Sequence, residues 1–149
     1  RCTSTRARLF VITLLMKMYE AIGERIAAEG VRSFFGLMGD GNLKLIPHLV
    51  HERGVSFYGA RHEAGAVAMA DGYARASGEV GVCTFTQGPG LTNAITALVT
   101  ARRGRTPLVA ISGDTPTVVQ GLPQDIEQRP FWEAADVPVL SIALAGVEQ

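Results

Sequence analysis

Hydrophobic positions along this chain follow two spacings, one typical of helices and one typical of short buried strands. Small apolar side chains recur four residues apart at Ala66, Ala70 and Ala74, which predicts a helix with one closely packing face. Short apolar runs lie between such helical stretches and predict strands at residues 31–37, 55–58 and 80–85 and from Leu108 onward. Strand and helix therefore alternate along most of the chain.

This repeated order predicts an α/β fold, with a three-layer, doubly wound, mostly parallel sheet and helices on both faces. The other expected helices cover residues 19–27, 43–50 and 90–102. After Asp114 the pattern weakens into a connection that contains Pro and Gly, and we expect a short helix at 131–135 and a last strand at 137–142.

Length and composition favour one ordinary domain. A chain of 149 residues can bury about two thirds of its unfolded surface. Fourteen basic residues balance fourteen acidic ones, so net charge does not indicate a nucleic acid partner. The two cysteines, Cys2 and Cys83, cannot form a disulfide framework or a zinc-type spacing, which favours a reducing compartment, and we expect the cytoplasm.

The first residues imitate a targeting signal. Arg1, Arg6 and Arg8 precede an apolar run at 9–15, which is too short to span a bilayer and has no clear small-residue cleavage site after it. We expect residues 1–17 to be an extension, a tag or a misplaced start, and residues 18–149 to be the domain. No other segment suggests a membrane span.

The segment 60–75 contains the main candidate for chemistry. Glu63 lies where the strand at Val55 gives way to the predicted helix. In an open parallel sheet, ligands bind beyond the carboxyl ends of the strands, which is where this junction falls. The structural alternative is a first-turn carboxylate that complements the helix dipole, worth about 0.3–1 kcal/mol.

Two glycine-rich segments also follow predicted strands. In Gly39-Asp40-Gly41-Asn42 we expect the glycines to allow a tight turn and Asp40 or Asn42 to cap the second helix, because a magnesium site would need further oxygen ligands. The segment 87–93 exposes backbone N–H groups that suit an anion or a closely packed ring. It lacks the residues of a P-loop or a dinucleotide fingerprint, although nucleotide binding, with Asp114 as the ribose ligand, stays an alternative.

The histidines and the clustered arginines have simpler explanations. His48 and His51 are three residues apart and could share a metal ion, but without a third ligand we expect them on a solvated helix face. His62 either points into the site or begins the helix. Three arginines near a helix end are expected to form a solvated cluster: Arg102, Arg103 and Arg105.

Four motifs carry a more specific resemblance. They are Arg-His-Glu-Ala at 61–64, Met-Ala-Asp-Gly-Tyr-Ala-Arg at 69–75, Gln-Gly-Pro-Gly-Leu-Thr-Asn at 87–93 and Thr-Pro-Leu-Val-Ala-Ile-Ser-Gly-Asp at 106–114. Together, and in this order, they resemble the N-terminal, pyrimidine-binding domain of thiamine-diphosphate-dependent enzymes of the acetolactate synthase and 2-oxo-acid decarboxylase group. The resemblance runs from about residue 18 to about residue 140.

The resemblance implies a cofactor, a set of site residues and partners. Glu63 would be catalytic, with a hydrogen bond to the aminopyrimidine ring of thiamine diphosphate that favours its imino tautomer. The residues expected at the cofactor are Gly39, Glu63, Gln87, Gly88, Pro89, Gly90, Asn93 and Gln128. Mg²⁺ and the diphosphate would be held by a second domain that this chain lacks, either in a longer chain or in another subunit, and a homodimer is expected. Met38 replaces a proline that the family often has before the glycine of this loop.

The implied activity is decarboxylation or acetolactate-type carboligation of a small 2-oxo acid, that is, a lyase or transferase reaction. Because no adjacent His pair occurs, carboligation is favoured slightly, and the isolated chain is expected to be inactive. Two alternatives stay open. The chain could be the small subunit of a two-chain decarboxylase similar to sulfopyruvate decarboxylase, or a non-catalytic binding remnant.

Overall fold

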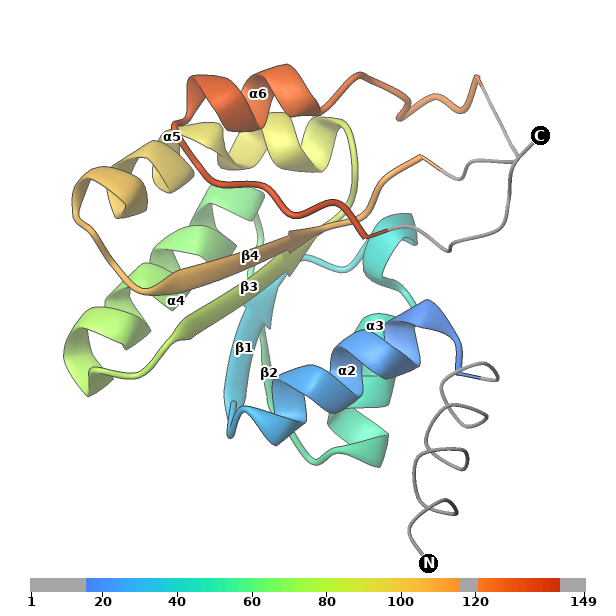
Figure 1. The fold of residues 1–149 in the computed structure, drawn as a ribbon, viewed down its shortest axis with the longest axis vertical. Helices are drawn as coiled ribbons and strands as arrows, with labels where there is room; N and C mark the ends of the chain where they lie inside the picture. The colour runs from blue at the N-terminus through green and yellow to red at the C-terminus, as the bar shows by residue number, and fades with distance from the viewer. Residues whose placement is uncertain (1–15, 116–120, 143–149) are drawn as a thin grey trace, which may run out of the picture.

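Four parallel strands form the centre of the fold, in the spatial order β2-β1-β3-β4 (Figure 1). The computed structural model describes residues 16–115 and 121–142. The strands are β1 (Ser33–Gly36), β2 (Ser56–Gly59), β3 (Gly81–Phe85) and β4 (Leu108–Ser112). The helices are α2 (Met18–Ala28), α3 (Leu45–Pro47), α4 (Glu63–Ser77), α5 (Pro89–Arg103) and α6 (Arg129–Ala134). The predicted parallel α/β fold is confirmed.

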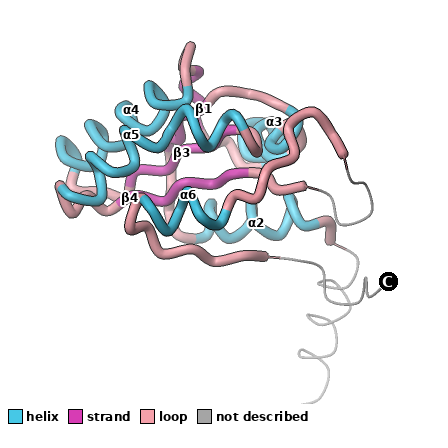
Figure 2. The backbone as a smooth tube through the Cα atoms, turned by 90° about the horizontal axis from the view of Figure 1, so that it is seen from above, coloured by secondary structure: helices cyan, strands magenta, loops and turns pink. Residues whose placement is uncertain are grey.

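Successive side chains of the strands enter two separate cores, as the two-residue period of a strand requires. Phe34 and Val82 pack with α2, α3 and the turn that follows α3. Their neighbours Phe35 and Cys83 pack instead with α4, α5 and α6. Figure 2 shows the strands between α2 on one side and α4 and α5 on the other, which is the predicted three-layer arrangement.

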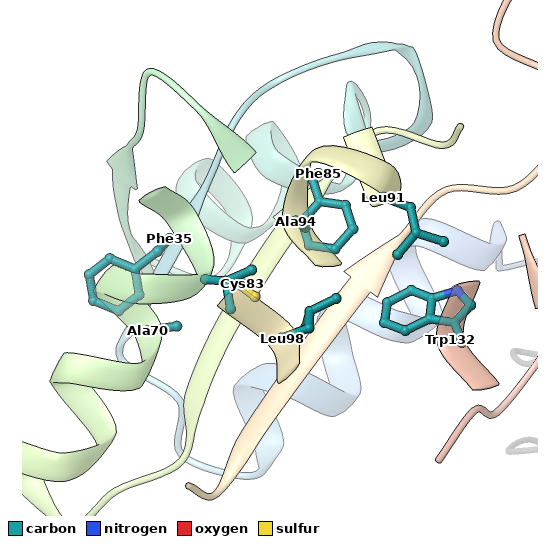
Figure 3. Packing of buried hydrophobic residues seen from close by; sticks show 9 residues of the cluster. Phe35, Ala70, Cys83, Phe85, Leu91, Ala94, Leu98 and Trp132 are labelled. Atoms are coloured by element: carbon teal, nitrogen blue, oxygen red, sulfur yellow. The ribbon is translucent and has the colours of Figure 1, made fainter. Parts of the chain in front are cut away.

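The core beneath α4 and α5 combines small helical residues with large residues from the strands (Figure 3). Ala70 is fully buried, and Gly81 of β3 lies so close to its carbonyl group that a Cβ there would overlap it. Phe85 stacks on Trp132 of α6, with 6.3 Å between ring centroids. Burial raises the pKa of the Cys83 thiol to about 12, so this cysteine is a packing residue at neutral pH.

The second predicted helix, at 43–50, is not a regular helix. Its α-helical part is only α3, and a π-helical turn, His48–Glu52, follows it. Pro47 has no N–H group, and its ring crowds the carbonyl group four residues earlier, so it interrupts the α-helical hydrogen-bond pattern. Leu45, Ile46 and Leu49 of this segment are nevertheless buried against the sheet, so the segment packs on it as the connection between β1 and β2.

The predicted last strand is wrong. Residues 137–142 are described and contain no strand, and Leu140 is 84% exposed. Pro138 removes one of the backbone donors that a ladder with the outer edge of β4 would need. The short helix expected at 131–135 is confirmed as α6. The expectation for residues 1–17 falls outside the described residues, apart from Met16 and Lys17.

Strand order defines the edge of the sheet at which a ligand would bind. From β1 the chain moves to one side to form β2, and from β3 it moves to the other side to form β4. The connections at the carboxyl ends of β1 and β3 therefore diverge, and such a switch point is where open α/β sheets bind ligands. In the part of the chain that the structure describes, no helix is long and apolar enough to cross a membrane.

Candidate functional site

The buried polar side chains of the described residues gather at this carboxyl edge. They are Asn42, Glu63, Thr84, Gln87 and Gln128, and each is at most 8% exposed. Glu63 is the only charged residue among them. Burying a carboxylate is unfavourable unless it is paired, so its presence here needs an explanation beyond packing.

Glu63 is the first residue of α4 and is 8% exposed. The side chain of Asn93 donates a hydrogen bond from Nδ2 to Glu63 Oε2, at 3.1 Å. The other oxygen, Oε1, has no hydrogen-bond partner among the described residues and is not sealed from solvent. His62 is exposed and begins the helix, because its Nδ1 accepts a hydrogen bond from the Ala64 N–H at 3.2 Å.

The start of α5 leaves space beside the free oxygen of Glu63. A Cβ placed on Gly90 would lie 3.8 Å from Oε1 and 3.0 Å from the Thr86 methyl group, so glycine keeps this position open. Gly88 has φ +62° and ψ −111°, and a Cβ there would overlap the carbonyl group of Gln124. Pro89 follows at the first helical position, which suits its fixed φ. Few other residues could therefore replace Gly88 and Gly90 without changing this turn.

The loop after β1 is a tight turn that its own asparagine closes. Asn42 Oδ1 accepts from the Gly39 N–H at 2.8 Å, and Nδ2 donates to the Leu37 carbonyl at 3.1 Å and to Thr84 Oγ1 at 3.2 Å. The expected tight turn is present as a 3₁₀ turn at Asp40–Asn42. The expected helix cap is wrong, because Lys44 rather than Asp40 or Asn42 precedes α3. Within the described ranges, no three His, Cys, Asp or Glu side chains are placed to hold a metal ion.

Thr86 joins the loops that follow three strands. Its Oγ1 accepts from the Gly41 N–H at 3.1 Å and lies 2.8 Å from Gln87 Oε1 and 3.4 Å from Gln124 Oε1. Gly41 in turn lies against Gly113, which follows β4. A Cβ added to Gly113 would be 2.6 Å from the Gly41 Cα. Thr86 and Gln124 were not predicted as site residues. The position of Thr86, directly after β3, is the signal that could have identified it.

Gln128 is embedded among these loops. Its Oε1 accepts from the Gly88 N–H at 3.1 Å and from Ser112 Oγ at 3.2 Å. Its Nε2 donates to the Gly113 carbonyl at 3.0 Å and to Asp114 Oδ1 at 2.9 Å. Asp114 also accepts from the Thr115 N–H at 2.8 Å, so the candidate ribose ligand is bound within the fold.

Two of the simpler expectations need correction. The His48 side chain does not lie on a solvated face. It is only 10% exposed, because α2 packs over it with Gly23 and Tyr19. Within the described part of the chain its Nε2 has no hydrogen-bond partner, and it is 3.6 Å from Glu24 Oε1. Exposed His51 fits the expectation. Arg102 is not merely solvated, because it binds the carbonyl and the carboxylate of Asp136 at 2.6 and 3.0 Å.

A surface hollow of the described residues lies elsewhere. It has a volume of about 900 Å³ and lies between α2 and the π-helical turn, so it shares no residue with the Glu63 site. A smaller hollow of about 330 Å³ lies beside Gln128 and is lined by Asp114, Thr115, Asp125, Ile126, Glu127 and Gln128. The candidate site is the one at Glu63 rather than the larger hollow, because the buried polar groups of the described residues converge at the carboxyl edge.

Comparison with known proteins gives one consistent result. Residues 16–136 match the family described as thiamine pyrophosphate enzyme, N-terminal TPP binding domain. A probable acetolactate synthase large subunit of Methanocaldococcus jannaschii is 43% identical over 106 residues, which cover 71% of this chain and 18% of that protein. The 2-hydroxyacyl-CoA lyase 2 of Danio rerio is 41% identical over 116 residues, or 76% of this chain and 18% of that protein.

A solved structure agrees with the sequence relatives. An X-ray structure from Mycobacterium smegmatis, assigned to a thiamin diphosphate-dependent enzyme, superimposes with a TM-score of 0.62 and 25% identity. The match covers 70% of this chain and 20% of that one. The chain thus spans about a fifth of the length of these relatives.

Proposed function

This chain belongs to the family of N-terminal thiamine pyrophosphate-binding domains, and we propose that it forms the cofactor-activating part of a larger enzyme acting on 2-oxo acids. One observation carries the proposal. Glu63 is a buried carboxylate with one oxygen held by Asn93 and the other left without a partner among the described residues. An arrangement that served stability alone would engage both oxygens.

The residues around Glu63 suit a flat heteroaromatic ring. Gly90 leaves room next to Oε1, and the backbone turn at Gly88 and Pro89 keeps side chains away from the start of α5. We propose that Gly39 and Gln87 border the same space from the loops after β1 and β3. When bound, thiamine diphosphate supplies the stabilisation of negative charge on carbon that cleavage or formation of a bond next to a carbonyl group requires.

The chain's own contribution is the handling of one proton. Glu63 Oε1 would hold or release a proton at the pyrimidine ring of the cofactor, while Asn93 fixes the carboxylate by donating to Oε2. The fully buried side chains of Val67 and Leu91 lie near the starts of α4 and α5 and would make the surroundings of the carboxylate apolar. A proton held in a water-poor site is transferred along one defined path, which is the condition for efficient general acid–base catalysis.

We assign the remaining functions to parts outside this chain. A second domain, in the same longer chain or in another subunit, would hold the diphosphate and Mg²⁺, and the assembled enzyme would be a cytoplasmic homodimer. The isolated chain would then be inactive. A two-chain decarboxylase and a non-catalytic remnant remain the alternatives, and the free oxygen of Glu63 disfavours the remnant because a remnant has no use for it.

The test compares the assembled enzyme with its Glu63→Gln variant, both supplied with thiamine diphosphate and Mg²⁺. Proton exchange at C2 of the bound cofactor, followed by NMR in heavy water, reports activation without requiring a known substrate. We expect exchange to slow by roughly 10²- to 10⁴-fold, the usual contribution of a positioned acid or base. Equal exchange rates in the two proteins would refute the proposal.

A second candidate activity is the cleavage of 2-hydroxyacyl-CoA thioesters. It is favoured by the Danio rerio lyase, which matches over 116 residues of this chain. Both activities would use Glu63 in the same way, so the substrate must decide between them. Assays of the assembled enzyme with pyruvate and with a 2-hydroxyacyl-CoA, in parallel, separate the two.

A further inference from the structure

Gln128 is held in place by the core rather than by the loop in which it lies. Its backbone carbonyl accepts from the Phe131 N–H at 3.1 Å, which begins α6. One turn later Trp132, only 9% exposed, stacks on Phe85 of β3, as Figure 3 shows. The side chain of Gln128 therefore extends from a fixed point toward the carboxyl edge of the sheet.

The carboxamide of Gln128 has little hydrogen-bonding capacity left for a ligand, although the single proton of the Ser112 hydroxyl is shared among Gln128 Oε1 and the carbonyl groups of Thr86 and Gly113. A glutamine side chain can accept two hydrogen bonds and donate two. The four partners are the Gly88 N–H, Ser112 Oγ, the Gly113 carbonyl and Asp114 Oδ1, and the residue is 7% exposed. A direct bond to a cofactor or substrate would require one of these bonds to break, which disagrees with the contact implied by the sequence.

One of these bonds links Gln128 to Glu63 through α5. Gly88 has a φ of +62°, which glycine adopts readily, and its N–H is held by Gln128 while its carbonyl accepts from the Thr92 N–H at 3.1 Å in the first turn of α5. Asn93 is the next residue, and it donates to Glu63. We propose that Gln128 is a positioning residue, which fixes the first turn of α5 so that Asn93 meets the Glu63 carboxylate. This inference rests on the proposed role of Glu63.

The first measurement needs no cofactor. In the assembled protein without thiamine diphosphate, amide hydrogen exchange of residues 87–93 is compared for the unaltered protein, Gln128→Ala and Glu133→Ala. Glu133 is exposed on the same short helix and serves as the matched control. We expect Gln128→Ala to speed exchange at 87–93 by roughly tenfold, since about one net hydrogen bond is lost there, while exchange in α4 stays unchanged and the control resembles the unaltered protein.

The second measurement is C2 proton exchange of bound thiamine diphosphate, with a rescue variant. Gln128→Glu keeps the acceptor for Gly88 but places an oxygen against Asp114, so it should slow C2 exchange about as much as Gln128→Ala. Adding Asp114→Asn to Gln128→Glu exchanges the hydrogen-bond donor and acceptor of this pair, because the new amide at position 114 can donate to the new carboxylate at position 128. The double variant should recover most of the C2 exchange rate.

Several outcomes would overturn the inference. Slower C2 exchange with unchanged amide exchange at 87–93 would indicate direct contact between Gln128 and the cofactor. Faster amide exchange throughout α4 and β3 would indicate a general loss of stability. If Glu63→Gln retains full C2 exchange, the proposed function fails, but the amide-exchange result for residues 87–93 still decides whether Gln128 holds α5. If Glu63→Gln is impaired and Gln128→Ala is not, only the inference fails.

Discussion

Glu63 and Asp71 are carboxylates of the same helix, α4, and their surroundings differ in one respect. Both oxygens of Asp71 accept hydrogen bonds from Arg75 Nε, at 3.0 and 2.9 Å, and Oδ1 also accepts from Thr106 Oγ1 at 2.5 Å. Glu63 is more deeply buried, yet among the residues that the structure describes it has one partner, Asn93, on one oxygen. Asp71 lies in the half of α4 farther from the carboxyl edge.

The difference agrees with the proposal that Asp71 is a stabilising carboxylate and Glu63 a reactive one. Partial burial would raise the pKa of Asp71, but the hydrogen bonds from Thr106 and Arg75 outweigh it and hold the pKa below the ordinary value. These bonds use the capacity of Asp71 and tie α4 to the segment before β4. Glu63 keeps an accessible oxygen in a buried position, which costs stability and is useful only where a proton must be exchanged.

The largest contrast between the two carboxylates should appear in turnover. In the assembled enzyme, Glu63→Gln should lower kcat by roughly 10²- to 10⁴-fold, because a positioned proton carrier is lost. Asp71→Asn should leave kcat close to that of the unaltered enzyme. Steady-state assays at saturating thiamine diphosphate and Mg²⁺ measure both. Comparable losses in the two variants would remove the distinction between them.

For the free energy of unfolding, the Asp71 variant should show the larger loss of the two. Asp71→Asn should lower the free energy of unfolding by about 2 kcal/mol, because hydrogen bonds to a charged group are weakened. Glu63→Gln keeps an acceptor for Asn93 and should change stability much less. Urea unfolding at neutral pH, followed by circular dichroism, gives both values. A greater loss for Glu63→Gln would mean that Glu63 is a structural residue.

Asn93 provides a smaller test of how Glu63 is oriented. Asn93→Ala should lower kcat by about fivefold, since the carboxylate loses about 1 kcal/mol of positioning by one hydrogen bond. Thr96→Ala, at an exposed position about one turn further along α5, is the matched control and should have no effect on kcat. An Asn93→Ala enzyme with unaltered kcat and C2 exchange would show that Glu63 needs no orienting partner.

The weakest expected effect is on acid stability. Because the pKa of Asp71 is lower in the folded chain than the ordinary 3.8, its ionised form stabilises the fold above pH 3.8. That contribution is lost as the pH falls below this value toward the folded-state pKa. Asp71→Asn should therefore reduce the difference in unfolding free energy between pH 5 and pH 3. An unchanged difference would show that Asp71 makes no net contribution to acid stability.

The local sequence pattern was sufficient to predict the strands and the main helices, and to place Glu63 where a strand gives way to a helix. Hydrophobic spacing predicted all four strands and the helices α2, α4 and α5 within a few residues. It also placed Glu63 at a strand-to-helix junction, and the strand order makes that junction part of the ligand-binding edge. These features depend on residues close together in the chain, whose side-chain period sets their conformation.

The contacts and hydrogen-bond partners of the polar side chains could not be predicted from the local pattern. His48 was expected in solvent and is covered by α2. Gln128 was expected at the cofactor, which stays a prediction, and its hydrogen bonds within the fold were not foreseen. The π-helical turn after Pro47 and the absence of a strand at 137–142 also departed from the simple pattern.

By itself, the sequence determined the alternation of strands and helices, the glycine turn at Gly88 and the position of Glu63 at the start of α4. Only the tertiary structure decided that Asn93, thirty residues later, meets one oxygen of Glu63, and that Gln128, forty residues after Gly88, holds its N–H. The reason is physical. Periodicity describes which way a side chain faces on its own element, whereas a hydrogen bond requires two atoms from distant segments to lie about 3 Å apart, and only the packed sheet sets that distance.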